Sequence, residues 1–279
     1  MESGTSQGVR SVQHDLFGVI GRPARHSLSP AMMQAAFELL GIKAYYLAFE
    51  ADTLSQALPV LEGLGCRGLS VTVPFKQEAL SWCVRLDPAA QAIGAVNTLR
   101  RTESGWEGRN TDWVGAVRAL ERLLPLRGVS ALVLGAGGAA RGVVYGLIQS
   151  GAHVIIANRT ESRAHELAAE FQCSWVPLSH LDQVQPQVVV QTTSAGMSGN
   201  PYGFQIPEGF FTPHMVVMDI VYVPLETPFL RQAKAAEARI VDGLEMLLYQ
   251  GMEQLSWWLN RPAPEAVMRQ ALRRAVRHQ

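Results

Sequence analysis

A short glycine-rich segment near the middle of the chain has the residue types and spacing to bind a phosphate group. An apolar run over residues 129–134 ends in Gly135-Ala-Gly-Gly-Ala-Ala140, and a second apolar run covers residues 152–157 after a helix-compatible stretch. A strand, a tight turn and a helix N-terminus in this order direct free N–H groups and the positive end of the helix dipole at an anion. The pattern predicts the first half of a dinucleotide-binding fold, although glycine also marks ordinary turns between a strand and a helix.

The residues after the second apolar run predict which dinucleotide binds. A site for NAD requires an acidic residue about 20 residues beyond the glycines to bind the ribose 2′-hydroxyl. This chain has Asn158 and Arg159 there, with Arg163 one helical turn later. A guanidinium pairs with a 2′-phosphate whereas a carboxylate repels it, so these residues favour NADP. The simpler alternative is that both arginines lie on a solvated helix start.

Two hydroxyl side chains precede the first predicted helix. Pro30 suits the first position of a helix over residues 30–40, which makes Ser29 the natural N-cap. Ser27 lies two residues earlier, and a second hydroxyl at a helix N-terminus could bind an anion such as a carboxylate. Turn and capping roles are the simpler interpretation of the pair.

Four more polar residues lie where a strand or a helix could direct them at a ligand, and each has a structural alternative. Lys76 follows a predicted strand end and a proline turn, but most lysines are solvated. Asn97 has apolar neighbours, so it is either a buried structural amide or a ligand contact. Asp112 could cap the helix that follows it. Gln250 shares a helix side with core residues, which by itself predicts a helix flank beside a domain interface.

The elements that must position these residues alternate between strands and helices. In the first part we expect strands over residues 14–21, 44–50 and 68–73, helices over 30–40, 52–64 and 77–84, a short helix opened by Asp87-Pro88, and a hairpin over 100–109. Asp52 is the expected cap of the second helix. In the second part we expect a helix ending near Leu124, strands over 129–134, 152–157, 187–190, 215–221 and 239–242, and helices over 161–171, 227–236, 243–259 and 264–276. This alternation predicts an α/β architecture.

The composition limits the class of protein. The chain has 279 residues, 48% of them hydrophobic and 17% charged, with a formal net charge of zero. It is long enough for two domains, and nothing points to nucleic acid or to a membrane as a partner. Cys66, Cys83 and Cys173 have no CxxC spacing, which predicts buried reduced thiols in a cytoplasmic protein, with neither a disulfide nor a metal site. Residues 1–13 are polar and predict a disordered tail rather than a signal peptide.

Nine short motifs, in one order along nearly the whole chain, resemble those of the shikimate dehydrogenase family. They are His26-Ser-Leu-Ser-Pro30, Val71-Thr-Val-Pro-Phe-Lys76, Gly94-Ala-Val-Asn-Thr98, Gly108-Arg-Asn-Thr-Asp112, Gly135-Ala-Gly-Gly-Ala-Ala140, Asn158-Arg-Thr160, Thr193-Ser-Ala-Gly-Met197, Met218-Asp-Ile-Val-Tyr222 and Gly243-Leu-Glu-Met-Leu-Leu-Tyr-Gln250. The resemblance implies an NADP-dependent enzyme that reduces 3-dehydroshikimate to shikimate on the route to chorismate and the aromatic amino acids. It also implies that Lys76, Asp112 and Gln250 are functional rather than structural.

The resemblance implies a role for each candidate residue. Lys76 and Asp112 would form the catalytic pair, in which the ammonium stabilises the charge that grows on the carbonyl oxygen and delivers a proton without any metal. The substrate carboxylate would be held by Ser27, Ser29 and Tyr222, and its ring hydroxyls by Thr72, Asn97 and Gln250 together with the catalytic pair. NADP would be bound by Gly135, Ala136, Gly137, Gly138, Ala139, Ala140, Asn158, Arg159, Thr160, Arg163, Thr193 and Gly243.

The resemblance also implies two α/β domains with catalysis in the cleft between them. Residues 114–243 would form a Rossmann-like NADP-binding domain. Residues 1–113 would form an N-terminal substrate-binding α/β domain that the C-terminal helices in 244–279 complete. The two domains would close around their ligands, and the protein would be a monomer or a homodimer.

The chain departs from the family pattern in two places, and two alternatives remain open. Gln191-Thr-Thr-Ser194 stands where Asn-Ala-Thr-Ser is usual, near the expected nicotinamide end of the cofactor site, and Met33-Gln34 stands where His-Asn is frequent. One alternative is a dual-specificity quinate/shikimate dehydrogenase that uses NAD or NADP. The paired serines and the arginines at the cofactor speak against it. The other is a non-catalytic NADP-binding sensor, against which the presence of both Lys76 and Asp112 speaks.

Overall fold

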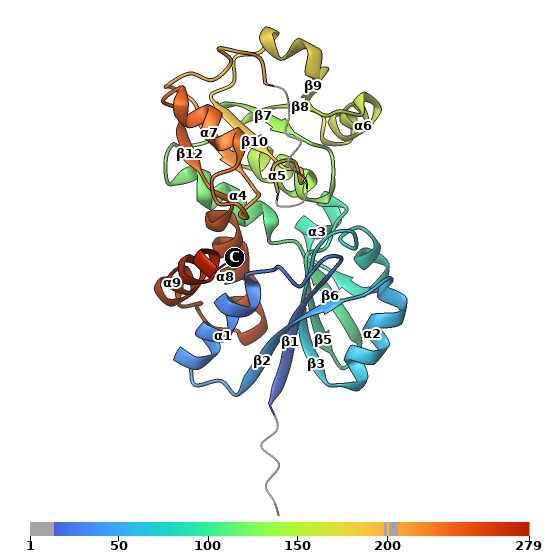
Figure 1. Ribbon diagram of the computed structural model, residues 1–279. Helices are drawn as coiled ribbons and strands as arrows, with labels where there is room; N and C mark the ends of the chain where they lie inside the picture. Colours follow the sequence, from blue (N-terminus) through green and yellow to red (C-terminus); the bar gives the residue numbers. More distant parts are fainter. Residues whose placement is uncertain (1–13, 198–199, 201–205, 279) are drawn as a thin grey trace, which may run out of the picture.

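The computed structural model describes residues 14–197, 200 and 206–278. Within these residues the strands form two six-stranded sheets, each with helices around it, and the two lobes lie one above the other in Figure 1. This arrangement confirms the expected α/β fold class. The tail predicted over residues 1–13 lies outside the described residues. None of the described helices is long and apolar enough to cross a membrane.

The first sheet is mixed. Its order is β2-β1-β3-β5-β6-β4, in which β1 is parallel to β2 and β3, and β5 is antiparallel to β3 and β6. The strands are β1 (Asp15–Gly21), β2 (Ala44–Glu50), β3 (Cys66–Val71), β4 (Cys83–Leu86), β5 (Thr98–Thr102) and β6 (Gly105–Arg109). Because β1 and β3 are parallel, the loops that follow them meet at one edge of the sheet.

The second sheet is parallel throughout and has the order β12-β11-β10-β7-β8-β9. Its strands are β7 (Ser130–Leu134), β8 (His153–Ala157), β9 (Ser174–Trp175), β10 (Val188–Gln191), β11 (Val216–Asp219) and β12 (Arg239–Val241). Counted from β7, this is the Rossmann order 3-2-1-4-5-6, whose ligand crevice lies where the order reverses, between β7 and β10. The glycine turn follows β7, at that position.

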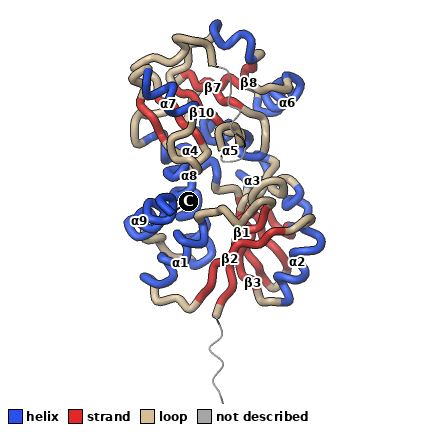
Figure 2. The backbone as a smooth tube through the Cα atoms, viewed as in Figure 1, coloured by secondary structure: helices blue, strands red, loops and turns tan. Residues whose placement is uncertain are grey.

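Helices cover both faces of each sheet, as Figure 2 shows. They are α1 (Ser29–Leu39), α2 (Leu54–Gly63), α3 (Pro88–Ile93), α4 (Asp112–Glu121), α5 (Gly138–Gln149), α6 (Glu161–Phe171), α7 (Pro228–Ala235), α8 (Gly243–Leu259) and α9 (Glu265–Ala275), with 3₁₀ turns at Glu78–Trp82, Leu178–Gln183 and Val276–His278. Alternate residues of β1 face different cores: Phe17 packs with α1, α8 and α9, whereas Ile20 packs with α2. The strand period of two therefore distributes the apolar residues between two layers.

Helices α4 and α8 pack against each other between the two lobes (Figure 1). A Cβ atom on Gly115 of α4 would lie 2.7 Å from the backbone oxygen of Met246 and 2.9 Å from Cβ of Gln250. On another side α4 packs on α5, where a Cβ on Gly142 would lie 3.1 Å from Cβ of Asp112. Glycine at these two positions lets three backbones approach closely, and this contact fixes the N-terminus of α4 beside α5 and α8.

Several elements differ from the sequence predictions. The strand over 44–50 and the helices over 161–171 and 243–259 are confirmed to the residue. The helix predicted over 77–84 is present only as the 3₁₀ turn Glu78–Trp82, because Cys83 starts strand β4, which gains its hydrogen bonds from pairing with β6. The predicted cap Asp52 is also wrong: Thr53 Oγ1 accepts the N–H of Gln56 at 3.3 Å, while Asp52 pairs with Arg22.

All three cysteines are free, but only Cys66 is buried, so the expectation of buried thiols fails for Cys83 and Cys173.

Candidate active site

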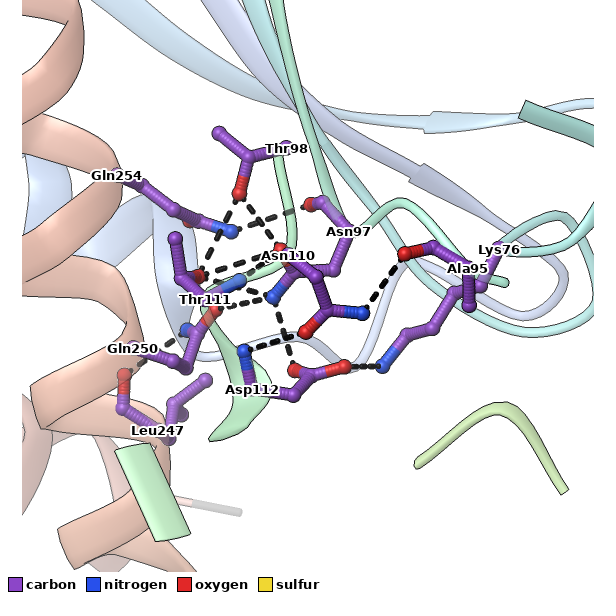
Figure 3. A network of polar contacts seen from close by, with 10 residues as sticks. All are labelled: Lys76, Ala95, Asn97, Thr98, Asn110, Thr111, Asp112, Leu247, Gln250 and Gln254. Atoms are coloured by element: carbon purple, nitrogen blue, oxygen red, sulfur yellow. Dashed lines mark hydrogen bonds and ion pairs between the residues drawn. The ribbon is translucent and has the colours of Figure 1, made fainter. Parts of the chain in front are cut away.

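Lys76 and Asp112 form an ion pair at the edge of the first sheet (Figure 3). Lys76 lies in the turn after β3, and Asp112 is the first residue of α4. Lys76 Nζ donates a hydrogen bond to Asp112 Oδ2 at 2.7 Å, and the two side chains are only 13% and 6% exposed. A pair this poorly hydrated has a well-defined geometry, and loss of either partner would leave an uncompensated charge.

Asn97 fixes the other oxygen of the Asp112 carboxylate. Its Nδ2 donates to Asp112 Oδ1 at 2.8 Å, to Thr111 Oγ1 at 3.0 Å and to Gln250 Oε1 at 3.3 Å. Its Oδ1 accepts hydrogen bonds from the backbone N–H of Thr111 and the hydroxyl of Thr98, both at 2.7 Å. Both oxygens of Asp112 are therefore held by neighbouring donors, so the carboxylate orients the Lys76 ammonium (Figure 3).

The capping interpretation of Asp112 is wrong. The N-cap residue of α4 is Thr111, and no side chain there forms a capping hydrogen bond. The carboxylate of Asp112 bonds to Lys76 and Asn97 instead. Asn110 supports this turn, since its Oδ1 accepts the N–H of Asp112 at 3.0 Å and its Nδ2 donates to the carbonyl of Ala95 at 2.9 Å. Sequence reasoning missed Asn110 and Thr111, although both lie in the motif that contains Asp112.

Helix α8 contributes two buried glutamines to the same network. Gln250 lies beside Asn97, and its Nε2 donates to the carbonyl of Leu247 at 2.9 Å. One turn later, Gln254 Nε2 donates to the backbone oxygen of Asn97 at 3.2 Å, and its Oε1 accepts the Ser70 hydroxyl at 2.6 Å. The four-residue spacing on α8 thus aligns both amides with the turn at Asn97, and Gln254 and Ser70 are members that sequence reasoning did not assign.

The two serines lie in a second polar group near the start of α1. Ser29 is the first residue of α1, and the N-cap residue is Leu28, which has no side-chain capping bond, so the prediction of Ser29 as N-cap is wrong. Ser27 Oγ accepts the N–H of Ser29 at 3.2 Å and is hydrogen-bonded to the side chain of Tyr222. Burial raises the pKa of the Tyr222 phenol, which keeps it a neutral O–H donor.

Two other contacts fix the loops around these serines. Glu50, at the end of β2, accepts the N–H groups of Ala24 and Arg25 at 3.0 and 3.2 Å, and Arg25 holds the pKa of the Glu50 carboxyl at about 2. Thr72 follows β3 directly, and its N–H donates to the carbonyl of Ile20 at 2.9 Å. Thr72 and the serine loop therefore lie at the same edge of the first sheet, the edge from which the turn containing Lys76 emerges.

The glycine turn has the geometry that a pyrophosphate requires. Gly135 has φ of +122°, a conformation that L side chains rarely adopt. No atom lies within 4 Å of a Cβ placed on Gly137, the N-cap residue of α5, where no side chain forms a capping bond. A Cβ on Gly138 would lie 3.5 Å from Cβ of Lys76. The free N-terminus of α5 therefore opens beside the lysine, and the residues present fit a dinucleotide phosphate.

The predicted 2′-phosphate residues lie at the end of β8 and the start of α6. Gly135 N donates to the carbonyl of Ala157 at 2.8 Å, which brings this strand end next to the glycine turn. Arg159 and Arg163 are exposed, and no described residue forms an ion pair with either. Asn158 Nδ2 donates to the carbonyl of Thr160 at 2.9 Å, which shapes the turn between strand and helix. Two exposed guanidiniums next to the phosphate turn fit NADP better than NAD.

Thr193 and Gly243 complete the predicted cofactor residues. Thr193 lies after β10, and its Cγ2 would be 2.9 Å from a Cβ on Gly135, so the two loops of the crevice are in contact. Gly243 begins α8 and is buried: a Cβ there would lie 2.5 Å from the carbonyl oxygen of Ile220. Gly243 therefore packs closely against the loop that leads to Tyr222, and this explains why the residue is a glycine.

A buried carboxylate connects the loops after β10 and β11, and sequence reasoning gave it no role. Asp219 Oδ1 accepts the N–H of Val221 at 3.0 Å and the Nε2 of Gln191 at 3.1 Å, while Oδ2 accepts the Thr227 hydroxyl at 2.6 Å. Gln191 in turn donates to the carbonyl of Thr193 at 3.2 Å. Burial raises the pKa of Asp219 to about 6. Its position as the one charge in an apolar strand was the signal in the sequence.

Three family models match successive parts of the chain. Residues 19–99 match the family described as the shikimate dehydrogenase substrate binding domain, 118–198 match shikimate / quinate 5-dehydrogenase, and 243–273 match the shikimate 5'-dehydrogenase C-terminal domain. A relative from Syntrophobacter fumaroxidans, named shikimate dehydrogenase (NADP(+)), is 50% identical over 272 residues, which are 95% of this chain and 95% of the relative.

Solved structures agree with this relationship. The shikimate 5-dehydrogenase from Thermus thermophilus, solved in complex with NADP(H) and shikimate, is 39% identical with a TM-score of 0.85, and the match covers 93% of this chain and 99% of the other. Quinate dehydrogenase from Corynebacterium glutamicum in complex with NAD is 28% identical with a TM-score of 0.85, over 94% of this chain and 99% of that one. With a curated relative at half identity over nearly its full length, the chain belongs to the shikimate dehydrogenase family.

Proposed function

We propose that this chain catalyses the reversible NADPH-dependent reduction of 3-dehydroshikimate to shikimate, in the shikimate pathway to chorismate and the aromatic amino acids. The observation that carries the proposal is the Lys76–Asp112 ion pair of 2.7 Å beside the free N-terminus of α5. A proton donor and a dinucleotide phosphate site at this proximity are what the reduction of a ketone needs. The names of the close relatives and of the solved neighbours supply the substrate.

We assign the substrate site to the polar residues around the catalytic pair. Ser27, Ser29 and Tyr222 would bind the carboxylate, because their side chains lie in one polar group: the Ser27 hydroxyl is bonded to the N–H of Ser29 and to the Tyr222 side chain, and the Ser29 side chain is bonded to Tyr46. The ring hydroxyls would contact Thr72, Lys76, Asn97, Asp112 and Gln250. Around a polyhydroxylated ring the amides both donate and accept hydrogen bonds, the ammonium donates and the carboxylate accepts, which suits a substrate with several adjacent hydroxyls.

The chemistry of the residues follows from their positions. NADPH, when bound, supplies the hydride that reduces the carbonyl carbon. Lys76 would lie against the carbonyl oxygen, stabilise the negative charge that develops there and donate a proton to form the alcohol. Asp112, held by Asn97 on its other oxygen, keeps the ammonium oriented and accepts a hydrogen bond from the neighbouring ring hydroxyl. In the oxidation direction, Lys76 without its proton accepts one from the shikimate hydroxyl.

We assign cofactor binding to the turn after β7 and the loops beside it. Residues 135–140 would hold the pyrophosphate, Asn158, Arg159, Thr160 and Arg163 the 2′-phosphate, and Thr193 and Gly243 the nicotinamide end. The open space over Gly137 and the two exposed arginines support this choice. A carboxylate would be required at the end of β8 for an NAD enzyme, and the residue there is Asn158.

We further propose the domain limits and the location of the protein. Residues 1–113 with 244–279 would form the substrate domain and 114–243 the NADP domain, because the two sheets separate at α4 and α8. The protein would be cytoplasmic, as its three free thiols favour a reducing compartment. It would act as a monomer or a homodimer.

Product analysis tests the proposal directly. Incubation of the purified protein with 3-dehydroshikimate and NADPH should yield shikimate and NADP⁺ in equal amounts, measured by NMR of the reaction mixture. Tight binding of NADPH with no product would instead support the non-catalytic sensor. Equal efficiency in the reduction of 3-dehydroquinate to quinate would support the dual-specificity enzyme.

A further inference from the structure

A cavity of about 330 Å³ lies in the substrate lobe at the end opposite the catalytic lysine. Asp15 and Arg67 line it from the starts of β1 and β3, and Arg261 lines it just after the end of α8. Lys76 follows the other end of β3, so the full length of the strand separates the cavity from the proposed active site. The volume is in the range of small-molecule sites.

The cavity gathers positive charge that its acidic residues do not balance. Four arginines line it, namely Arg67, Arg100, Arg101 and Arg261, and among the described residues Asp15 is the one lining carboxylate. Arg67 pairs with Asp15 at 3.0 Å through Nη1. Arg100 and Arg101 pair outside the cavity lining with Glu107 and Glu62, and Glu107 is shared with Arg85. No ion pair of Arg261 occurs within the part of the chain that the structure describes.

The aromatic wall of the cavity is held in place by the surrounding structure. Trp258 Nε1 donates to the carbonyl of Leu99 at 2.9 Å, and its ring lies 5.3 Å from that of Phe17, a second lining residue. Arg100 stacks on the neighbouring Trp257 ring at 4.4 Å and donates to its backbone oxygen at 3.2 Å. A ligand would therefore meet an indole ring and an Arg100 guanidinium that are already fixed in position, which lowers the entropic cost of binding.

We propose that this cavity is a second ligand site, for a small aromatic carboxylate. The flat ring of such a ligand would lie along Trp258, Ile42 and Leu259, the partly exposed apolar lining residues, and its carboxylate would bind Arg261 and the free face of the Arg67 guanidinium. An inorganic anion would leave the apolar wall uncovered, and an uncharged aromatic molecule would leave Arg261 without a partner. The site is separate from the proposed active site and does not depend on the proposed function.

Calorimetric titration with 2-naphthoate, in the presence of saturating shikimate, tests the proposal. The wild-type protein should bind one equivalent with a Kd below about 1 mM. Arg261→Gln should weaken binding about tenfold, because one charge-assisted hydrogen bond is lost. Arg67→Gln should weaken it more, since Asp15 then faces the ligand as an unpaired carboxylate. Arg127→Gln, at an exposed loop position of the other lobe, is the matched control and should bind as the wild type does.

Two further titrations separate the chemistry of the ligand. The uncharged 2-naphthalenemethanol and inorganic phosphate should each bind at least about tenfold more weakly than 2-naphthoate. The proposal is overturned if 2-naphthoate gives no heat, if both cavity variants bind it normally, or if shikimate displaces it. Phosphate binding as tight as that of 2-naphthoate would also overturn it, because the aromatic wall would then play no part.

Discussion

Lys76 and Asp112 meet where little water reaches them, so each depends on the other for its charge and orientation. The turn after β3 supplies the lysine, and the first turn of α4 supplies the carboxylate. Asn97 connects them to Thr111 and to Gln250 on α8. The separation of 36 residues along the chain is closed by the sheet and by the packing of α4 on α5. The fold, rather than the local sequence, therefore creates this ion pair.

We expect Lys76 to act in the chemical step. Lys76→Met should lower kcat for shikimate oxidation by at least about a hundredfold, because the reacting oxygen loses its proton partner and its charge partner. The KM for shikimate should change much less. Lys76→Arg is the control for the ion pair: it keeps the positive charge but does not give up a proton, so it should fold normally and still be slow. Steady-state kinetics measure kcat. A kcat of Lys76→Met equal to that of the wild type would show that Lys76 takes no part in the chemical step.

We expect Arg159 to determine the preference for NADP over NAD. Arg159→Gln should raise the KM for NADP about ten- to a hundredfold, since a charge-assisted bidentate contact with the 2′-phosphate is lost. The KM for NAD should stay nearly unchanged, and Arg163→Gln should act in the same direction. Initial rates measured with each cofactor give the ratio of the KM for NADP to the KM for NAD. If the KM values for NADP and NAD rose by the same factor, the assignment of Arg159 to the 2′-phosphate would be wrong.

The contact of α4 with α8 determines the position of the catalytic carboxylate. Gly115→Ala should destabilise the protein by about 2–4 kcal/mol, because the new Cβ would lie 2.7 Å from the backbone oxygen of Met246, and backbone cannot move aside as a side chain does. It should also raise the KM for shikimate, since Gln250 lies at the same contact. Urea unfolding measures the stability. Gly63→Ala is the control, as open space surrounds that position near the end of α2, and it should be neutral or slightly stabilising.

The loops after β10 and β11 give a pH-dependent prediction. The pKa of Asp219 is raised by burial from its ordinary value near 3.8 to about 6, so the folded state holds this proton more tightly than the unfolded state does. Its stabilising contribution is complete below about pH 4 and is lost as the pH rises through 6, by a total of about 3 kcal/mol.

Asp219→Asn should remove this dependence. The unfolding free energy of the variant minus that of the wild type should be about 2 kcal/mol larger at pH 7 than at pH 4.5. Urea unfolding at the two pH values measures it. Asp182→Asn, at an exposed position, is the control and should show no such change. A difference that is the same at both pH values would contradict the raised pKa.

The order of strands and helices along the chain was largely predictable, because buried parallel strands and amphipathic helices leave a local pattern in the sequence. The glycine turn was predictable for the same reason. Strand β4 was not, because its hydrogen bonds come from β6, 20 or more residues away in the chain. Propensity alone cannot register such long-range pairing.

Some residues of the candidate site were identifiable from the sequence and others were not. Lys76, Asn97 and Asp112 have no local signal that separates catalysis from solvation, burial or capping, and only the resemblance across nine motifs identified them. Their hydrogen bonds became visible once the fold brought them together. Gln254, Ser70 and Asp219 had no assigned role in the sequence, because a buried polar group is recognised by its partners, which lie on other elements.

In the function proposed above, one site combines the oxidation of shikimate with selectivity for NADP. An absorbance assay of nicotinamide reduction tests this claim. It is run with shikimate or quinate and with NADP or NAD, in all four combinations. We predict that kcat/KM is highest for shikimate with NADP, by at least about tenfold over each other combination. Comparable values with quinate or with NAD would contradict the claim and identify a dual-specificity enzyme.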